Sequence, residues 1–279
     1  MTETFLWRRV LQTTCAVLVI TVAASTVQAV CAADSATLGD HPAVFDGFDG
    51  AANSAPDGAI WDYDVGRWQT NGQLQEYTSS RDNIRVDGAG HLIIEARSTE
   101  SGITSGRLVT RHRVPMLYGT LSARIKMPTG KGISPSFWLV GTDIDTAGWP
   151  DCGEIDLVEM PSSGTYRYTT LHGPWTARPP GARSDYQIQT QAQTVDLSAD
   201  FHTYWVVRAP GSIVIGMDGT TFATFTPESL SPDQRWVFDH PMYAILNVAV
   251  GDDWAGPPDE TTSWPATMVV DWFRWEPAA

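Results

Sequence analysis

The chain has 279 residues and a formal net charge of −14, with 32 acidic against 18 basic side chains. A surface this acidic repels nucleic acid and anionic membranes, and it suits an uncharged substrate better than a sulfated one. Three cysteines are too few for a disulfide framework, so a hydrophobic core must hold the fold, and the length suffices for one large β-sandwich domain.

The first 33 residues have the composition of a signal peptide. Arg8 and Arg9 precede the apolar run 15–24, which is too short for a permanent membrane span, and small residues follow it. The arginine pair also suggests twin-arginine export as an alternative to the general secretory route. We therefore predict a signal peptide at 1–33 and one domain at 34–279. We expect the mature protein to be secreted and monomeric, and to bind neither membranes nor nucleic acid.

Strand-like segments follow one another along the mature chain, with turn residues roughly every ten positions. These segments are 83–87, 91–97, 119–127, 133–141, 201–208, 212–217, 221–225, 243–250 and 267–275. Glycine turns at 88–90 and 218–219 join neighbouring segments into hairpins, and only 227–234 resembles a helical turn. The pattern predicts an all-β fold, a sandwich of two antiparallel sheets.

Three carboxylates lie in a further strand-like segment, in the order Glu154, Asp156 and Glu159, with Ile, Leu and Val between them. Side chains alternate faces along a strand, so Glu154 and Asp156 share one face. In a regular strand Glu159 would point to the opposite face. A β-bulge between Asp156 and Glu159 would return Glu159 to that face. Like charges gathered on one face cost stability and raise the pKa of at least one member. This cost favours a catalytic role over a solvated acidic strand.

Hydrolysis of a glycosidic bond with retention needs such a set: a nucleophilic carboxylate and a second carboxyl that is protonated at rest, roughly 5–5.5 Å apart. The Cα atoms of Glu154 and Glu159 would lie roughly 13 Å apart at about 3.3 Å per residue, a gap that two glutamate side chains leaning together can narrow to a few ångströms. Asp156 between them can hold the pair in different protonation states.

Residues 143–154 also match a calcium-binding loop at positions 1, 3, 6 and 12, but Ala147 supplies no ligand at position 5. Such a loop needs a helix on each side, whereas strand-like segments flank this one and Pro150 lies inside it. We expect residues 141–143 to form a turn between two strands, and we expect no calcium loop.

The chain has 12 tryptophans, whose rings can stack on sugars or fill a core. Trp205 and Trp275 lie in alternating runs, so we expect them in the core. Four others stand beside Gly, Pro or Asp at strand ends or in loops, where cleft residues originate: Trp138, Trp149, Trp175 and Trp254. His172 precedes the turn that carries Trp175, and both a cleft role and a purely structural one remain open for it.

The strings FWLVG at 137–141 and GWPDCGEIDLVE at 148–159 resemble the signature of family 16 glycoside hydrolases, specifically the bacterial laminarinase-like endo-β-1,3-glucanases. Further similarity covers nearly the whole mature chain, at 74–77, 104–110, 118–119, 172–173, 201–204, 237–241, 247–251 and 254–258. The resemblance implies a β-jelly roll with a cleft across its concave sheet, and retaining endo-hydrolysis of β-1,3-glucan. It makes Glu154 the nucleophile, Asp156 the helper and Glu159 the acid/base. Its cleft candidates are Asn71, Arg107, Trp138, Trp149, His172, Trp175, Asn247 and Trp254.

Two departures from the family pattern concern ligands. The family often has Asn-Asn-Glu-Leu-Gln where this chain has NGQLQ at 71–75, which leaves the contacts of residues 71–73 open. It often has Asp-Glu-Phe where this chain has DGF at 46–48, and the missing carboxylate helps many relatives to bind a structural calcium. Asp271 is retained, but we predict neither a metal nor a cofactor.

Two alternatives remain open. Some relatives bind β-1,3-glucan without cutting it after losing the catalytic glutamates, although this chain keeps all three acids. The bulged spacing also occurs in agarase and carrageenase branches, so an agarase-like galactan hydrolase is the second alternative. The lead-in Gly-Trp-Pro-Asp-Cys-Gly at 148–153 resembles laminarinases, and the acidic balance weighs against a sulfated galactan.

Overall fold

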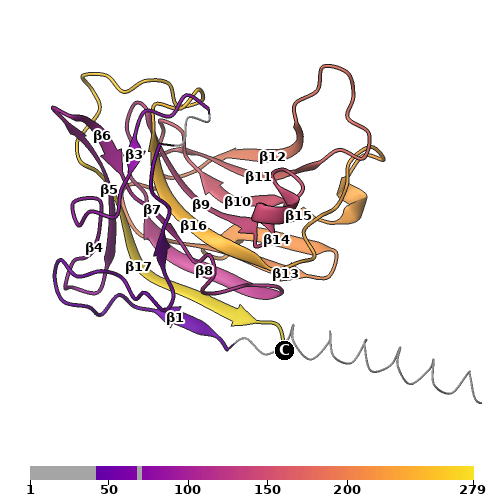
Figure 1. The fold of residues 1–279 in the computed structure, drawn as a ribbon, viewed down its shortest axis with the longest axis horizontal. Helices are drawn as coiled ribbons and strands as arrows, with labels where there is room; N and C mark the ends of the chain where they lie inside the picture. The colour runs from indigo at the N-terminus through magenta and orange to yellow at the C-terminus, as the bar shows by residue number, and fades with distance from the viewer. Residues whose placement is uncertain (1–41, 68–70) are drawn as a thin grey trace, which may run out of the picture. The chain divides into compact units, whose positions relative to one another are not determined.

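Two largely antiparallel sheets, packed face to face, make up the part of the chain that the computed structural model describes, residues 42–67 and 71–279 (Figure 1). The signal peptide predicted at 1–33 lies outside the described residues. None of the helices within the described ranges has the length and apolar character that crossing a membrane requires.

The first sheet has ten strands within the described ranges. In spatial order these are β15 (Thr220–Phe225), β14 (Ser212–Met217), β13 (His202–Ala209), β8 (Gly119–Lys126), β17 (Ala266–Pro277), β5 (Leu92–Thr99), β6 (Gly102–Ser105) and β3 (Glu76–Tyr77), with β1 (Val44–Asp46) beside β17 and β4 (Ile84–Val86) beside β5. The pairings are antiparallel except for that of β3 with β6.

The second sheet has seven strands in the described part of the chain. In spatial order these are β12 (Asp185–Gln193), β11 (Tyr166–Pro174), β10 (Glu154–Glu159), β9 (Ile133–Gly141), β16 (Met242–Val250), β7 (Arg107–Val109) and β2 (Asp62–Tyr63). A one-turn helix, α2 (Ile144–Ala147), lies between β9 and β10, and a 3-10 turn, η1 (Pro227–Ser229), follows β15.

The core fills the space between the two sheets, and strand alternation decides what enters it. Phe137 and Leu139 of β9 and Ile155 of β10 are fully or almost fully buried in it. All nine residues of β16 are buried, because one face of this central strand meets the core and the other is covered by cleft side chains. The predicted all-β sandwich and the hairpin of β4 with β5 are confirmed.

One of the two tryptophans expected in the core lies elsewhere. Trp275 is buried as predicted, but Trp205 is not a core residue. Its neighbours Tyr204 and Val206 point inward, so parity turns Trp205 to the outer face of β13, where its ring packs over Gly216. The turn expected at 141–143 is confirmed, because Thr142 and Asp143 form a turn directly after β9, and the one-turn helix α2 follows it.

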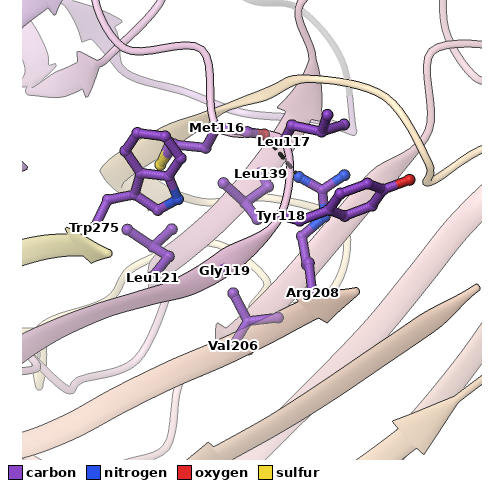
Figure 2. A pocket seen from close by; sticks show the side chains of 9 residues that line it. All are labelled: Met116, Leu117, Tyr118, Gly119, Leu121, Leu139, Val206, Arg208 and Trp275. Atoms are coloured by element: carbon purple, nitrogen blue, oxygen red, sulfur yellow. Dashed lines mark hydrogen bonds between the residues drawn. The ribbon is translucent and has the colours of Figure 1, made fainter. Parts of the chain in front are cut away.

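One small cavity lies between the sheets, beside the buried Arg208 (Figure 2). Its volume is about 10 Å³, and leucine, methionine and tryptophan side chains contribute to its lining. The guanidinium of Arg208 donates to the carbonyls of Met116, Phe238 and His240, so it fastens three loop carbonyls. Such a space holds one water at most, and Arg208 has a structural role there.

Candidate active site

The predicted β-bulge is present in β10. Asp156 pairs with Thr170 of β11 and Glu159 pairs with Tyr168, so three steps along β10 match two steps along β11. The register against β9 shifts at the same place. Glu154, Asp156 and Glu159 therefore all reach one cleft on the outward face of the second sheet.

The cleft has a volume of about 730 Å³, and β7, β9, β10, β11, β12 and β16 all contribute to its lining. Besides the three acids, seven of the residues predicted from the sequence line it: Asn71, Arg107, Trp138, Trp149, His172, Asn247 and Trp254. Trp175 does not. Its ring meets the edge of Tyr186 and its Nε1 donates to the carbonyl of Arg183, which places it beside the cleft wall.

His172 connects the acids to a buried carboxylate on the edge strand. Its Nδ1 lies 2.7 Å from Asp185 Oδ2, and its Nε2 lies 3.2 Å from Asp156 Oδ2 and 3.8 Å from Glu154 Oε1. Burial alone would lower the pKa of His172, but the bonds to Asp156 and Asp185, with the charge of Glu154, raise it to about 11. His172 is therefore an imidazolium at neutral pH, with Nδ1 hydrogen-bonded to Asp185 and Nε2 in an ion pair with Asp156.

The two glutamates differ in how their anions are supported. Burial, followed by the charge of Asp156, raises the pKa of Glu154 to about 7, while His172 and the Nε1 donor of Trp149 oppose this rise. The Trp149 bond is 2.9 Å long. Burial and Asp156 raise the pKa of Glu159 well above its usual range. The two glutamates titrate together as one buried, interacting pair. Because His172 and Trp149 support the Glu154 anion, Glu154 loses its proton first and Glu159 keeps its proton.

Across β9, β16 and β7, the cleft wall is built from a tryptophan held on two sides. Trp138 Nε1 donates to Asn247 Oδ1 at 2.7 Å, and Asn247 in turn donates to the hydroxyl of Tyr77. The guanidinium of Arg107 lies 4.8 Å from the Trp138 ring centre and 2.9 Å from Asp64 Oδ2. This indole ring is therefore fixed before any ligand binds.

Two tryptophans stand at the rim with much of their rings in solvent. Trp149 is 41% exposed and packs near His172. Trp254 is 45% exposed, and its ring lies edge-to-face with that of Tyr168, with 4.3 Å between the ring centres. Asn71 joins the rim through its carbonyl, which accepts from the backbone N–H of Asp253. Exposed, oriented indole faces at both ends of the carboxylate strand can stack on sugar rings.

A family model decides where this geometry belongs. The model for glycosyl hydrolases family 16 matches residues 71–274, which include every strand of the second sheet except β2. The chain belongs to this family.

Several known proteins similar to this family 16 chain are glucanases or laminarinases. A beta-glucanase of Rhodothermus marinus is 35% identical over 233 residues, 78% of this chain and 79% of the relative. The solved laminarinase catalytic domain of Thermotoga maritima is 34% identical with a TM-score of 0.74, over 85% of this chain and 97% of that one. A mutant of SCLam, a non-specific endo-β-1,3(4)-glucanase, presents a 1,3-β-D-cellobiosyl-glucose at its active site. It is 31% identical with a TM-score of 0.71, over 83% of this chain and 92% of that one.

Metal binding has little support in this family 16 glycoside hydrolase. One group in the described ranges has metal-ligand spacing, Glu154, Asp156 and His172, whose donor atoms lie within 4.8 Å of one another. A protonated imidazole there competes with a metal ion. At the calcium position that many relatives use, Asp46 accepts from Phe48 N and Trp61 Nε1, and Arg124 donates to Asp271. These oxygens face donors, so the residues do not fit calcium.

Much of the wall formed by β11 and β12 consists of residues that the sequence did not indicate. Tyr168, Thr170, Asp185 and the glutamines of β12 reach the cleft or its acids, yet none was a candidate. A signal existed, because Gln187, Gln189, Gln191 and Gln193 alternate with less polar residues at the period of a strand. From the sequence alone, glutamines that alternate along one strand cannot be distinguished from the polar face of an ordinary solvent-exposed strand.

Proposed function

We propose that this family 16 glycoside hydrolase is a secreted, retaining endo-β-1,3-glucanase of the laminarin-cleaving type. The observation that carries the proposal is the bulged strand β10, which presents Glu154, Asp156 and Glu159 together on the cleft floor. Retaining hydrolysis needs one carboxylate and one carboxylic acid, and the environments of Glu154 and Glu159 separate their protonation in that order.

In the first step the Glu154 carboxylate attacks the anomeric carbon and forms a glycosyl ester, while the carboxylic acid of Glu159 gives its proton to the departing glycosidic oxygen. In the second step the Glu159 carboxylate takes a proton from water, the water oxygen attacks the anomeric carbon, and the Glu154 ester bond breaks. The imidazolium of His172 and the Nε1 donor of Trp149 hold Glu154 ready as the anion.

The relatives and the charge of the cleft support a neutral β-1,3-glucan as the substrate. Matching solved enzymes include a laminarinase and an endo-β-1,3-glucanase. The lining holds five carboxylates, whereas Arg107 and Arg183 are each paired with an aspartate. A sulfated polysaccharide would meet repulsion there, and a neutral glucan would not. The tryptophans at the rim offer stacking surfaces for its rings.

The test is a product profile. Purified protein comprising residues 34–279 is incubated with laminarin, curdlan, lichenan and agarose, and the products are resolved over time. We expect laminarin to give oligosaccharides before glucose. Reducing ends from agarose with none from laminarin would establish the galactan hydrolase instead, and binding to laminarin without cleavage would establish the glucan-binding protein.

Secretion is part of the proposal and is supported by the composition of residues 1–33. Expression of the full chain in a bacterial host, followed by fractionation, should find the activity outside the cytoplasm. Replacing Arg8 and Arg9 by lysine separates the two export routes, because only twin-arginine export requires the arginine pair.

A further inference from the structure

A buried hydroxyl connects Glu159 to the edge strand of the sheet. Thr170 of β11 is fully buried, and its Oγ1 lies 3.4 Å from Glu159 Oε2. From the other side, Nε2 of Gln189 lies 3.1 Å from the same Oγ1. Asp156, Thr170 and Gln189 pair in register across β10, β11 and β12, so the backbone ladders fix the hydroxyl between the two side chains.

The chemistry of these groups gives the bonds a direction. An amide NH₂ only donates, so Thr170 Oγ1 accepts from Gln189. A threonine hydroxyl has a single proton, which is then free to be donated to Glu159 Oε2. Because Oε2 accepts the threonine proton, it is an unfavourable position for the acidic proton of the Glu159 carboxyl group. The acidic proton of Glu159 therefore belongs on Oε1.

We propose that Thr170 and Gln189 are positioning residues that hold Glu159 by Oε2 and reserve Oε1 for proton transfer. This inference rests on the acid/base role assigned to Glu159 in the proposed function. In the first step the proton on Oε1 passes to the glycosidic oxygen, and in the second step a proton from water returns to Oε1. Oε2 accepts from Thr170 throughout, so the carboxyl need not rotate between the steps.

The charged groups that face Glu159 show why a neutral donor is useful there. Asp156 and Glu154 on its own strand and Asp252 from the loop after β16 raise its pKa together with burial, and His172 on β11 opposes them. Strand β9 places Ser136 opposite Glu159. A hydrogen bond to the anionic form favours ionisation, so the Thr170 hydroxyl helps Glu159 to become the base required in the second step.

The principal test is the pH profile of laminarin hydrolysis by Thr170→Val. The basic limb of kcat/KM reports the acid in the free enzyme, and loss of the donor should move that limb up by about 0.5–1 pH unit. Thr170→Ser, which keeps the hydroxyl, should restore the limb. Gln189→Glu should move it in the same direction as Thr170→Val, because a carboxylate at 189 accepts the threonine proton in place of Glu159.

Two controls separate positioning from stability. Thr169→Val removes a neighbouring buried hydroxyl that points to the other face and donates to the carbonyl of Leu157, so it should lower the melting temperature and leave the limb in place. Gln193→Leu changes an exposed glutamine of β12 outside the cleft lining and should leave both unchanged. A Thr170→Val enzyme with a lower melting temperature and an unmoved limb would show that Thr170 is only structural.

A second readout does not depend on turnover. The carboxyl carbon of Glu159 can be followed by NMR in protein labelled with ¹³C at the glutamate side chains, with Glu159→Gln identifying its signal. We expect Thr170→Val to raise the titration midpoint by the same 0.5–1 unit. A raised midpoint in a protein that hydrolyses none of the four polysaccharides would uphold the positioning role and reject the proposed function. An unmoved midpoint in an active enzyme would reject the positioning role alone.

Discussion

The two walls of the cleft are built on different principles. On the side of β9, β16 and β7, Trp138 is held by Asn247 and Arg107. Tyr77 holds Asn247 in turn, and Asp64 holds Arg107. On the side of β11 and β12, a buried imidazolium lies between carboxylates, and glutamine amides extend from an edge strand into solvent. The first wall presents a fixed aromatic surface, and the second controls charge and protons.

Strand β10 lies between the two walls, so its carboxylates can use both of them. A sugar ring gains from a rigid stacking surface on one side, while the carboxylates need neighbours that set their ionisation on the other. Aromatic contacts should therefore determine affinity, and the β11–β12 side should determine the rate and its dependence on pH.

The largest effect is expected from the acids that both walls serve. Glu154→Gln or Glu159→Gln should lower turnover on laminarin by about 10³–10⁵-fold, because each variant removes a group essential to one of the two steps. Asp156→Asn should be milder, since Asp156 adjusts the ionisation of its neighbours. Reducing-end assays measure the loss, and circular dichroism checks that the fold is intact.

Azide then assigns the two roles. Added to Glu154→Ala, azide should give a glycosyl azide of inverted configuration, and added to Glu159→Ala it should give the retained one. Proton NMR of the products distinguishes the anomers. The opposite pair of outcomes would exchange the nucleophile and the acid/base.

Asp185→Asn tests the proton-controlling wall. Asp185 is buried, and the charge of His172 holds its pKa below the usual range. Without this carboxylate the pKa of His172 falls and the Glu154 anion loses support, so the acidic limb of kcat/KM should move to higher pH and turnover near neutrality should drop about tenfold. Arg183→Gln removes only the exposed partner of Asp185 and should move the limb far less. Equal shifts in the two variants would contradict a special role for His172.

The ionisation of Glu154 should also be visible in stability. In the folded protein the pKa of Glu154 is about 7, above the usual 4.5. The contribution of this side chain to the free energy of unfolding is therefore fully present below pH 4.5 and is lost as pH rises through 7. Glu154→Gln removes this penalty and should raise the free energy of unfolding by about 1–3 kcal/mol at pH 8.5, with little change at pH 4. Denaturant unfolding at both pH values measures it. Asp253→Asn, at an exposed rim carboxylate, should be nearly neutral at both.

The smallest effect concerns the rim aromatics. Trp149→Ala should weaken laminarin binding by about 1 kcal/mol, roughly fivefold, because one stacking surface is lost. The melting temperature should hardly change, since this ring is 41% exposed. Calorimetric titration in a Glu159→Gln background avoids cleavage during the measurement. Wild-type affinity combined with a lower melting temperature would show that Trp149 is structural.

The sequence by itself determined the alternating strands, the single sandwich and the catalytic strand with its bulge. These features depend on the period of side chains along one strand, so residues 154–159 alone predict that Glu154, Asp156 and Glu159 share a face. The string around them also carries the resemblance to family 16, and through it the positions of Trp138 and Trp149 in the cleft.

Only the tertiary structure decided which residues meet across strands. Trp205 alternates as a core residue would, but its parity on β13 turns it outward, and Trp175 packs on Tyr186 beside the cleft. The pairing of His172 with Asp185 and the row from Asp156 through Thr170 to Gln189 depend on the register of β10, β11 and β12. Register is set by the packing of whole strands and the turns that join them, and a one-residue slip would reverse every facing side chain.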